Sequence, residues 1–247
     1  MFTGIVTAVG TIEQRDERGD LRLRIACPFD PDKIAVGASI ACAGVCLTVV
    51  ERGGEAGNAW FAVDVSAETL SRTAQGMWRQ GAAINLEPSL KLGDELGGHI
   101  VSGHVDAVGR VVHRAAEGDS IRLTIEAPKP LAPFVAPKGS IAVDGVSLTV
   151  NEVEDQPGGA VRFGLNVIPH TSEVTTLGEL QVGNEVNLEI DTVARYLQLL
   201  STYSDHAGLP DATRAGLLAQ LAAAIDKRGG AIDIPYETLV VIARRLG

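Results

Sequence analysis

The chain has 247 residues, which is enough for one or two domains with cores of their own. Its formal net charge of -10 argues against a broad nucleic-acid-binding face, because such a face needs clustered Lys and Arg. No apolar run approaches the roughly 20 residues that span a bilayer, and the first residues lack the features of a signal peptide. The three cysteines show no zinc-ligand spacing, so we expect a cytoplasmic protein without zinc or disulfides.

Most of the chain shows the pattern of short β-strands. Residues 21–25 and 121–125 alternate apolar and polar side chains, as half-buried strands do. Residues 39–50 and 140–150 are rich in β-branched side chains, with a glycine interrupting each run. Residues 68–73 and 171–177 fit single helical turns that close a barrel end. About six strands per half, spaced by roughly 8 to 12 residues, predict small antiparallel barrels.

The pattern becomes helical from Thr192 onward. Asp191 or Thr192 is a suitable N-cap, and apolar residues then recur at helical spacing at Val193, Tyr196, Leu197 and Leu200. Residues 211–247 predict two more helices, separated at Gly229 and Gly230. The leucine stripe of this tail fits packing better than a partner site.

An internal duplication fixes the domain organisation. The sequence GVCLTV at 44–49 returns as GVSLTV at 145–150, and AVG, SIA and NLE also recur in order. The offset between the copies drifts only from 99 residues (Gly10 to Gly109) to 102 residues (Leu86 to Leu188). A period of that length is too long for a solenoid repeat, so we predict two tandem homologous domains.

Four motifs then point to a known family. MFTGIV at 1–6, the duplicated GVCLTV and GVSLTV, and GGHIVSGHVD at 97–106 resemble the riboflavin synthase family, in order, over about the first 200 residues. The resemblance implies a mainly β fold of two tandem six-stranded antiparallel Greek-key barrels plus C-terminal helices. The implied domains are lumazine-binding barrels at 1–98 and 99–190, a trimerisation helix at 191–204, and a helical extension at 205–247.

The resemblance also implies an activity. Two molecules of 6,7-dimethyl-8-ribityllumazine would dismutate, one giving a four-carbon unit to the other, without a metal or organic cofactor. In such enzymes each active site lies between the N-terminal barrel of one subunit and the C-terminal barrel of a neighbour in a homotrimer. Association with lumazine synthase, which makes the substrate, is open. We expect neither nucleic acid nor a membrane as a partner.

The implied site residues fall in matching places of the two halves. Catalytic or near-catalytic positions map onto Cys46, His104, Asp144, Ser147 and Ser39. The implied substrate-binding positions of the first half are Gly4, Ile5, Val6, Cys46, Leu47, Thr48, Asp64, Val65, Ser66, Ala67, Glu68 and Thr69. Those of the second half are Gly103, His104, Val105, Lys138, Ser147, Leu148, Thr149, Val167, Ile168, Pro169, His170, Thr171 and Ser172.

Positions at which the halves differ are the most informative, because a dismutation needs a donor and an acceptor. The matched pairs that differ are Cys46 and Ser147, Ile5 and His104, Ala43 and Asp144, and Gly37 and Lys138. The chain departs from the family at Ala43, where a polar residue, often Asn, is usual, and in the tail after about residue 204. A histidine side chain can move protons, which makes His104 a candidate for that step, whereas Ser, Thr or Cys can add to a ring carbon or position water.

Simpler interpretations exist for each of these residues. Cys46 alone fits a small buried strand residue, and Lys138 fits an ordinary turn lysine. His99 and His104 fit an interdomain turn; we assign His104 to the site and leave both interpretations of His99 open. Two other functions also compete: a non-catalytic lumazine-binding antenna protein, and a flavin reductase barrel. The latter needs a nicotinamide-binding domain, for which the residues after the second barrel are too few.

Overall fold

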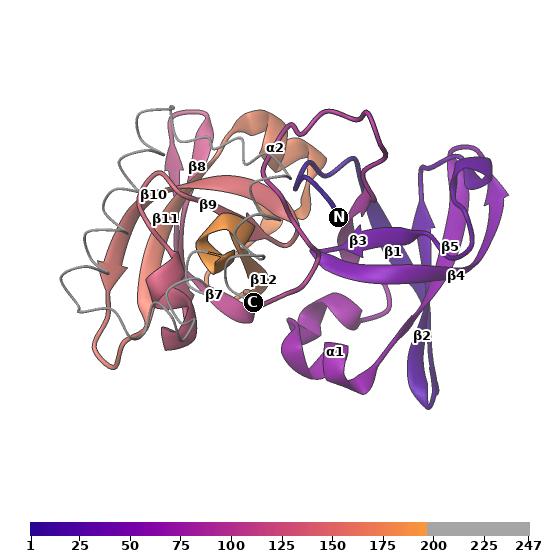
Figure 1. Cartoon of the computed structure of the whole chain (residues 1–247), viewed down its shortest axis with the longest axis horizontal. Coiled ribbons are helices and arrows are strands. Elements are labelled where there is room, and N and C mark those ends of the chain that lie inside the picture. The colour runs from indigo at the N-terminus through magenta and orange to yellow at the C-terminus, as the bar shows by residue number, and fades with distance from the viewer. Residues whose placement is uncertain (197–247) are drawn as a thin grey trace, which may run out of the picture. The chain divides into compact units, whose positions relative to one another are not determined.

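Each half of the duplicated sequence closes into a six-stranded antiparallel barrel in the computed structural model, which describes residues 1–196 (Figure 1). The strands of the first barrel pair in the order β1-β2-β5-β4-β3-β6. Their bounds are β1 Ala8–Arg18, β2 Asp20–Cys27, β3 Ser39–Cys42, β4 Val45–Glu55, β5 Asn58–Val65 and β6 Ala83–Pro88. This is the expected Greek-key barrel.

The second barrel repeats that topology. Its strands pair in the matching cyclic order β7-β8-β11-β10-β9-β12. Their bounds are β7 Ala107–Glu117, β8 Ser120–Ala127, β9 Ser140–Val143, β10 Val146–Asp155, β11 Val161–Val167 and β12 Glu185–Ile190. The two runs that sequence patterning marked as strands interrupted by glycine are the hairpins β3–β4 and β9–β10. The predicted fold class of the barrels is therefore confirmed.

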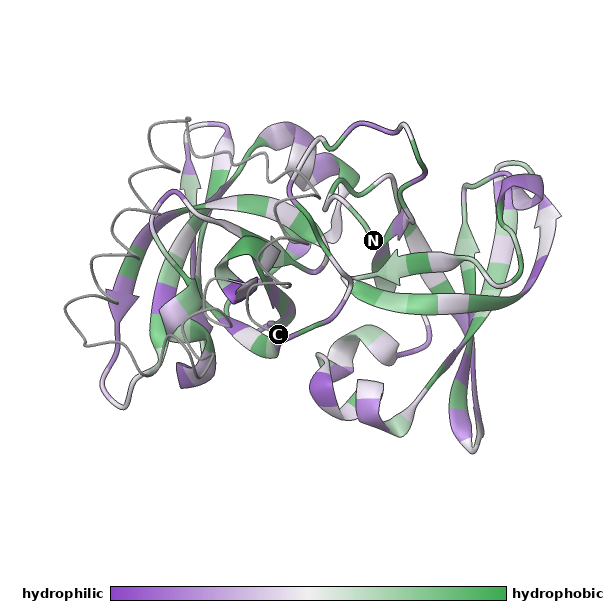
Figure 2. Ribbon diagram, in the orientation of Figure 1, coloured by the Kyte–Doolittle hydropathy of each residue, from purple (hydrophilic) through white to green (hydrophobic). Residues whose placement is uncertain are grey.

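Strand alternation builds a separate core in each barrel. Along β2 and β8 every second side chain turns inward, so apolar and polar residues alternate along the ribbons (Figure 2). Phe61 and Phe163 are fully buried at matching places in the two cores. A third, smaller cluster contains Phe2 and Val101 together with Ala41 of β3 and Ala142 of β9, so it joins the two halves.

Short helices follow β5 and β11, as expected. They are α1 (Ala67–Arg72) with the 3-10 turn Gln75–Trp78, and α2 (Pro169–Val174) with the 3-10 turn Thr176–Glu179. Two further 3-10 turns, Pro31–Lys33 and Lys129–Phe134, follow β2 and β8. Residues 192–196 are helical, as the pattern from Thr192 predicts, whereas the predicted tail helices lie outside the described residues. Within residues 1–196, no helix has both the length and the apolar character that crossing a membrane requires.

Candidate ligand sites at the crossing of the two halves

The segment that precedes β1 and the segment that precedes β7, here called the crossing segments, each contact the barrel of the other half. Phe2 and Val101 form an antiparallel bridge, with backbone hydrogen bonds of 2.7 and 3.0 Å. Beyond it, the N–H of Ser147 in the second barrel donates to the carbonyl oxygen of Gly4 at 2.8 Å. The N–H of Cys46 in the first barrel donates to the carbonyl oxygen of Gly103, also at 2.8 Å. Each barrel's GVxLTV strand is therefore covered by the segment that leads into the other barrel.

The apolar contacts follow the same exchange. Val6, in the segment before β1, packs on the core of the second barrel. Val105, in the segment before β7, packs on the core of the first. The sequence correctly predicted that residues 4–6 and 103–105 occupy matching places. It did not show that each segment crosses over, so each candidate site combines residues from both halves.

Glycine is required at the two positions, Gly4 and Gly103, where a crossing segment contacts the other barrel. Gly4 and Gly103 have φ of +76° and +80°, in the left-handed region that favours glycine. A Cβ on Gly103 would lie 2.7 Å from the Cβ of Cys46, and one on Gly4 would lie 2.6 Å from the Cβ of Ser147. Because glycine has no side chain, the backbone at Gly4 and Gly103 can approach Ser147 and Cys46, the residues by which the two sites differ.

Two glutamates hold the crossing segments in place. Glu87 of β6 accepts hydrogen bonds from the N–H and hydroxyl of Thr3 and from the N–H of Gly4, at 2.7 to 3.0 Å. Glu189 of β12 accepts four, from the N–H and hydroxyl of Ser102 and the N–H groups of Gly103 and His104. Burial raises the pKa of Glu87, an effect that the bonds from Thr3 and Gly4 oppose. Sequence reasoning did not single out either glutamate, although both belong to the repeated NLE motif.

The first candidate site gathers several predicted residues around Cys46. Ser39 pairs with Thr48 across β3 and β4, and Cys46 lies two residues before Thr48 on the same face. Cys46 is half-buried and Thr48 exposed, and Gly103 lies against Cys46. His104, the next residue, exposes its side chain. This brings Ser39, Cys46, Thr48 and the 103–105 segment together.

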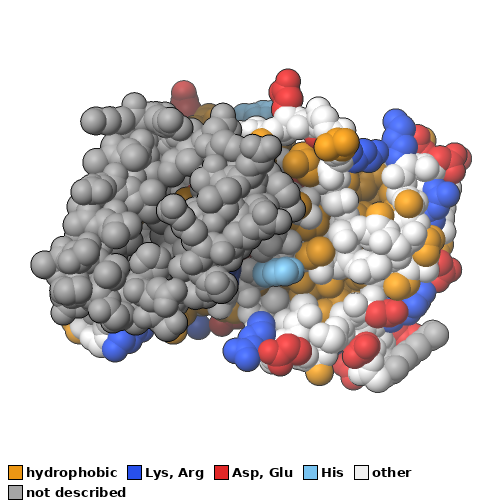
Figure 3. Space-filling model, in the orientation of Figure 1, with side chains coloured by type: hydrophobic (Ala, Val, Ile, Leu, Met, Phe, Trp, Pro, Cys, Tyr) orange, Lys and Arg blue, Asp and Glu red, His pale blue; other side chains and the backbone are white. Residues whose placement is uncertain are grey.

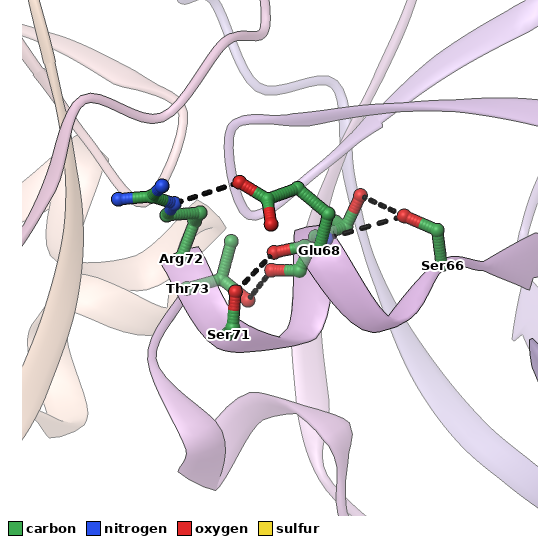
Figure 4. A network of polar contacts seen from close by, with 6 residues as sticks. Ser66, Glu68, Ser71, Arg72 and Thr73 are labelled. Carbon is green, nitrogen blue, oxygen red and sulfur yellow. Dashed lines mark hydrogen bonds and ion pairs between the residues drawn. The ribbon is translucent and has the colours of Figure 1, made fainter.

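Other predicted residues of this site face the core or serve the local helix. Leu47 and Val65 are buried in the first barrel's core, which leaves their backbone atoms to meet a ligand. Ser66 caps α1 by accepting a hydrogen bond from the Thr69 N–H at 3.2 Å, and Glu68 pairs with Arg72 (Figure 4). Asp64 is exposed and pairs with Arg22 of β2 at 3.4 Å. The polar groups at the start of α1 are thus already ordered by one another.

The second candidate site repeats this arrangement with different side chains. Ser140 pairs with Thr149, and half-buried Ser147 lies beneath Gly4. Ile5 beside it is 47% exposed, and Ile168 before α2 is 52% exposed. Figure 3 shows hydrophobic side chains lying among charged ones on one face of the described residues. Exposed apolar groups beside a few polar ones suit a flat heteroaromatic ring.

The remaining predicted residues of the second site follow the pattern of the first. Leu148 is half-buried against the second core and Val167 lies within it. Pro169 and His170 are exposed at the start of α2, and Thr171 and Ser172 are half-buried there. The hydroxyl of Ser147 has one neighbour that sequence reasoning left undecided: Nδ1 of His99 lies 2.7 Å away.

Asp144 lies in the turn between β9 and β10, at the seam where the second barrel contacts the first. Its carboxylate accepts the N–H of Asn187 at 2.7 Å, and its carbonyl oxygen accepts the side-chain amide of Asn85 at 2.9 Å. Burial raises the pKa of Asp144 to about 7. The residue borders a cavity of about 500 Å³ that Met77 and Thr176 also line. Among the described residues, its carboxylate has no hydrogen bond to Ser147 or His104.

Ala43 occupies the matching place on the other side of the seam. Its carbonyl oxygen accepts the side-chain amide of Asn187 at 2.9 Å, as that of Asp144 does from Asn85. Both residues have a φ of +46°. Ala43 therefore lies in a turn between the barrels and forms the same kind of backbone hydrogen bond there as Asp144 does.

Lys138 occupies a backbone position that the first barrel gives to glycine. The N–H of Lys138 donates to Val150 and that of Gly37 donates to Val49, both at 2.8 Å. Lys138 has a φ of +67°, which costs a side-chain-bearing residue about 1 kcal/mol. Its side chain is exposed.

The two matched barrels and their crossed sites are those of a duplicated lumazine-binding protein. The lumazine binding domain family accordingly matches the chain twice, at residues 3–89 and 102–191. A riboflavin synthase of Brucella abortus is 50% identical over 205 residues, covering 82% of this chain and 99% of that protein. Riboflavin synthases of Mycobacterium tuberculosis and Photobacterium phosphoreum are 45% and 42% identical, covering 81% of this chain and 98% and 88% of those proteins. The chain belongs to the riboflavin synthase family.

Solved structures share the barrel pair. Crystal structures of LumP complexed with riboflavin and with 6,7-dimethyl-8-(1'-D-ribityl) lumazine match with a TM-score of 0.63 and 26% identity. They cover 77% of this chain and 99% of LumP.

Proposed function

We propose that this chain converts two molecules of 6,7-dimethyl-8-ribityllumazine into riboflavin and 5-amino-6-(D-ribitylamino)uracil, by transfer of a four-carbon unit. The observation that carries the proposal is the pair of matched but unequal crossed sites. Cys46 contacts Gly103, the residue before His104, in one, and Ser147 contacts Gly4, the residue before Ile5, in the other. Equal sites would suffice for binding, whereas a dismutation gives its two identical substrates opposite roles.

Substrate binding would use the groups that the crossing brings together. The ring would lie against the exposed face of the GVxLTV strand, with the crossing segment along its edge. The ribityl chain would reach the polar start of α1 or α2, at 64–69 and 166–172. We further propose that Lys138 contributes charge at the second site, since its side chain is exposed there.

The reaction needs removal of a proton from a ring methyl group, addition of a nucleophile to a ring carbon, and joining of two ring systems. His104 has an exposed side chain on a backbone held by Glu189, which suits proton transfer. Cys46, Ser147 and the hydroxyl groups of Ser39 and Thr149 are the candidate nucleophiles or water-positioning groups. Holding two substrates in reacting orientation can supply about 7 to 11 kcal/mol of the barrier reduction.

Asp144 would act differently from the other predicted catalytic residues. Its carboxylate accepts the N–H of Asn187 within the second barrel, and its carbonyl oxygen accepts the side-chain amide of Asn85 from the first barrel, so we propose that it helps to orient the two barrels. The geometry supports this role better than direct contact with a ring.

A lumazine-binding antenna protein is the competing function. LumP shares the fold and binds lumazine in a solved structure, at 26% identity. The riboflavin synthases are 42 to 50% identical to this chain and cover more of it. This chain also keeps Cys46, His104 and Ser147, so we favour the enzyme.

The quaternary arrangement remains part of the proposal. We propose a cytoplasmic homotrimer with barrels at 1–98 and 99–190, a trimerisation helix at 191–204 and an extension at 205–247. Facing sites of neighbouring subunits would then bring two lumazines together. Association with lumazine synthase would shorten the path of the substrate.

The test is to incubate the purified full chain with 6,7-dimethyl-8-ribityllumazine and follow riboflavin absorbance. Parallel samples with a metal chelator, or with the substrate omitted, serve as controls. Riboflavin formation that the chelator leaves unchanged supports the proposal. Tight lumazine binding without turnover would instead identify an antenna protein, and absence of binding would exclude both functions.

A further inference from the structure

The side chain of Asn85 spans the seam between the two barrels. Asn85 belongs to β6 of the first barrel, yet its amide bonds two backbone groups of the second. Its Nδ2 donates to the carbonyl oxygen of Asp144 at 2.9 Å, and its Oδ1 accepts from the N–H of Thr176 at 2.8 Å. The residue is 1% exposed. A side-chain amide carries a donor and an acceptor together, so this one residue connects the turn before β10 to the segment after α2.

Asn187 of β12 repeats the arrangement in the opposite direction. Its Nδ2 donates to the carbonyl oxygen of Ala43 in the first barrel at 2.9 Å, and its Oδ1 accepts from the N–H of Ala74 at 2.8 Å. It is equally buried. Asn85 and Asn187 open the two copies of the NLE motif, and we call them the cross-barrel asparagines. Each one ties together two segments of the barrel to which it does not belong.

One end of each connection reaches the short helix of a candidate site. Thr175 donates its hydroxyl to the carbonyl oxygen of Thr171 in α2 at 2.6 Å. Thr73 donates in the same way to Thr69 of α1 at 2.8 Å. Thr175 and Thr73 each directly precede the residue whose N–H a cross-barrel asparagine binds, and Thr171 and Thr69 are expected at the ribityl end of their sites. A chain of contacts therefore runs from each asparagine to the helix of the other barrel's site.

The other end of each connection lies beside a GVxLTV strand. The turns that contain Ala43 and Asp144 pack directly on one another. A Cβ on Gly44 would lie 2.9 Å from the backbone nitrogen of Gly145, and one on Gly145 would lie 2.7 Å from that of Gly44. These turns lead into β4 and β10, which carry the half-buried residues of the two sites. Each asparagine thus helps to set the position of a site's strand relative to its helix.

We propose that the cross-barrel asparagines are positioning residues for the opposite barrel's ligand site, so that Asn85 of the first barrel orders the second site and Asn187 of the second barrel orders the first. The inference rests on the proposed function for the identity of the ligand. Both side chains act through the backbone groups that they bind at the seam. A substitution in one barrel therefore changes the ligand site of the other.

Amide hydrogen exchange of the ligand-free protein tests the crossed connection. Asn85→Ala leaves a carbonyl oxygen and an N–H of the second barrel without this partner, so exchange at 169–176 should quicken about tenfold or more. Exchange at 67–74 should change less than about twofold. Asn187→Ala should give the reverse, so each variant is the matched control of the other. Asn58→Ala, at an exposed position of β5, should alter neither helix.

Steady-state kinetics separate positioning from a general loss of folded protein. In Asn85→Ala the substrate has to order the loosened helix as it binds, so KM for lumazine should rise about tenfold while kcat at saturation changes less than about threefold. Loss of folded protein would instead lower kcat and leave KM unchanged. Asn85→Leu has a side chain of similar volume without the hydrogen bonds, and it should behave as Asn85→Ala does.

Three results would overturn the proposal. The first is faster exchange confined to the barrel that carries the substitution, and the second is a fall in kcat at unchanged KM. The third is an unchanged KM in Asn85→Leu, which would show that packing alone suffices.

Native-state exchange of the unmodified protein in low denaturant gives the same test if a substituted chain does not fold. The side-chain amide protons of Asn85 should exchange together with the amides of α2 and apart from those of α1. Exchange together with α1 would contradict the proposal. If the unmodified chain forms no riboflavin, the proposed function fails, whereas the exchange measurements need no ligand and still decide the crossed connection.

Discussion

The backbone N–H of Cys46 in the first barrel donates a 2.8 Å hydrogen bond to the carbonyl oxygen of Gly103, which leads into the second barrel. Ser147 and Gly4 form the matching bond in the other direction. Each GVxLTV strand is thereby completed by a segment that the other half supplies. One barrel alone would therefore lack part of its candidate site.

Substitution of Gly103 tests this crossing. Gly103→Ala should destabilise the protein by about 3 kcal/mol or more, since the new Cβ meets Cys46 and the backbone there has a φ of +80°. Gly37→Ala is the matched control, because Gly37 also has a positive φ but a Cβ there meets nothing within 4 Å. It should cost only about 1 kcal/mol. Denaturant unfolding measures both, and equal losses would show that the contact with Cys46 carries no weight.

Glu189→Gln tests whether the carboxylate positions the His104 segment. The amide N–H₂ would face one or two of the four donors, and each unsatisfied donor costs about 1 to 3 kcal/mol. We expect a lower kcat and faster amide exchange at residues 102–104. Glu87→Gln should instead loosen residues 3 and 4, where Glu87 has its three bonds. Unchanged exchange at 102–104 in Glu189→Gln would argue against this role.

The proposed proton transfer by His104 predicts a loss of rate on substitution. His104→Gln should lower kcat by about 100-fold or more while lumazine binding changes little, because a glutamine keeps the polar contact but cannot carry a proton. Steady-state rates of riboflavin formation measure the effect. An unchanged rate would remove His104 from the proton-transfer role.

Asp144 makes the stability of the fold depend on pH. Its pKa in the folded protein is raised to about 7 from the model-compound value of 3.8, so the fold favours the protonated carboxyl. That contribution is fully present below pH 3.8 and is lost as pH rises to about 7, by at most about 4 kcal/mol. Asp144→Asn should therefore unfold at nearly the same denaturant concentration at pH 5 and pH 8. The unmodified protein should be less stable at pH 8 than the variant, and a larger pH dependence in Asp144→Asn would contradict this account.

Much of the fold could be predicted because the relevant signals are local. Alternation in residues 21–25 and 121–125 gave the inward faces of β2 and β8, and the duplicated motifs gave the matching of the halves. The exchange of the leading segments carries no local signal. Residues 4–6 and 103–105 precede the first strand of their own barrel whether or not they cross to the other one, and only long-range contacts such as the hydrogen bond from Ser147 to Gly4 show the crossing.

For the candidate site too, the sequence pointed to some residues and missed others. Motif matching assigned Cys46, Ser147 and His104 to the candidate site, because they differ between otherwise equal copies. Glu87 and Glu189 were missed because their buried carboxylates accept bonds from segments about 85 residues away, and the repeated motif resembles an ordinary strand. His99 was left undecided because its relation to Ser147 exists only after the two segments cross.

The product balance of the reaction shows directly whether the chain carries out the dismutation. The unmodified chain is supplied with 6,7-dimethyl-8-ribityllumazine as the sole organic substrate, and both products are quantified by chromatography and mass spectrometry. We expect one riboflavin and one 5-amino-6-(D-ribitylamino)uracil for every two lumazines consumed. Bound lumazine recovered unchanged after prolonged incubation with the folded protein would contradict it.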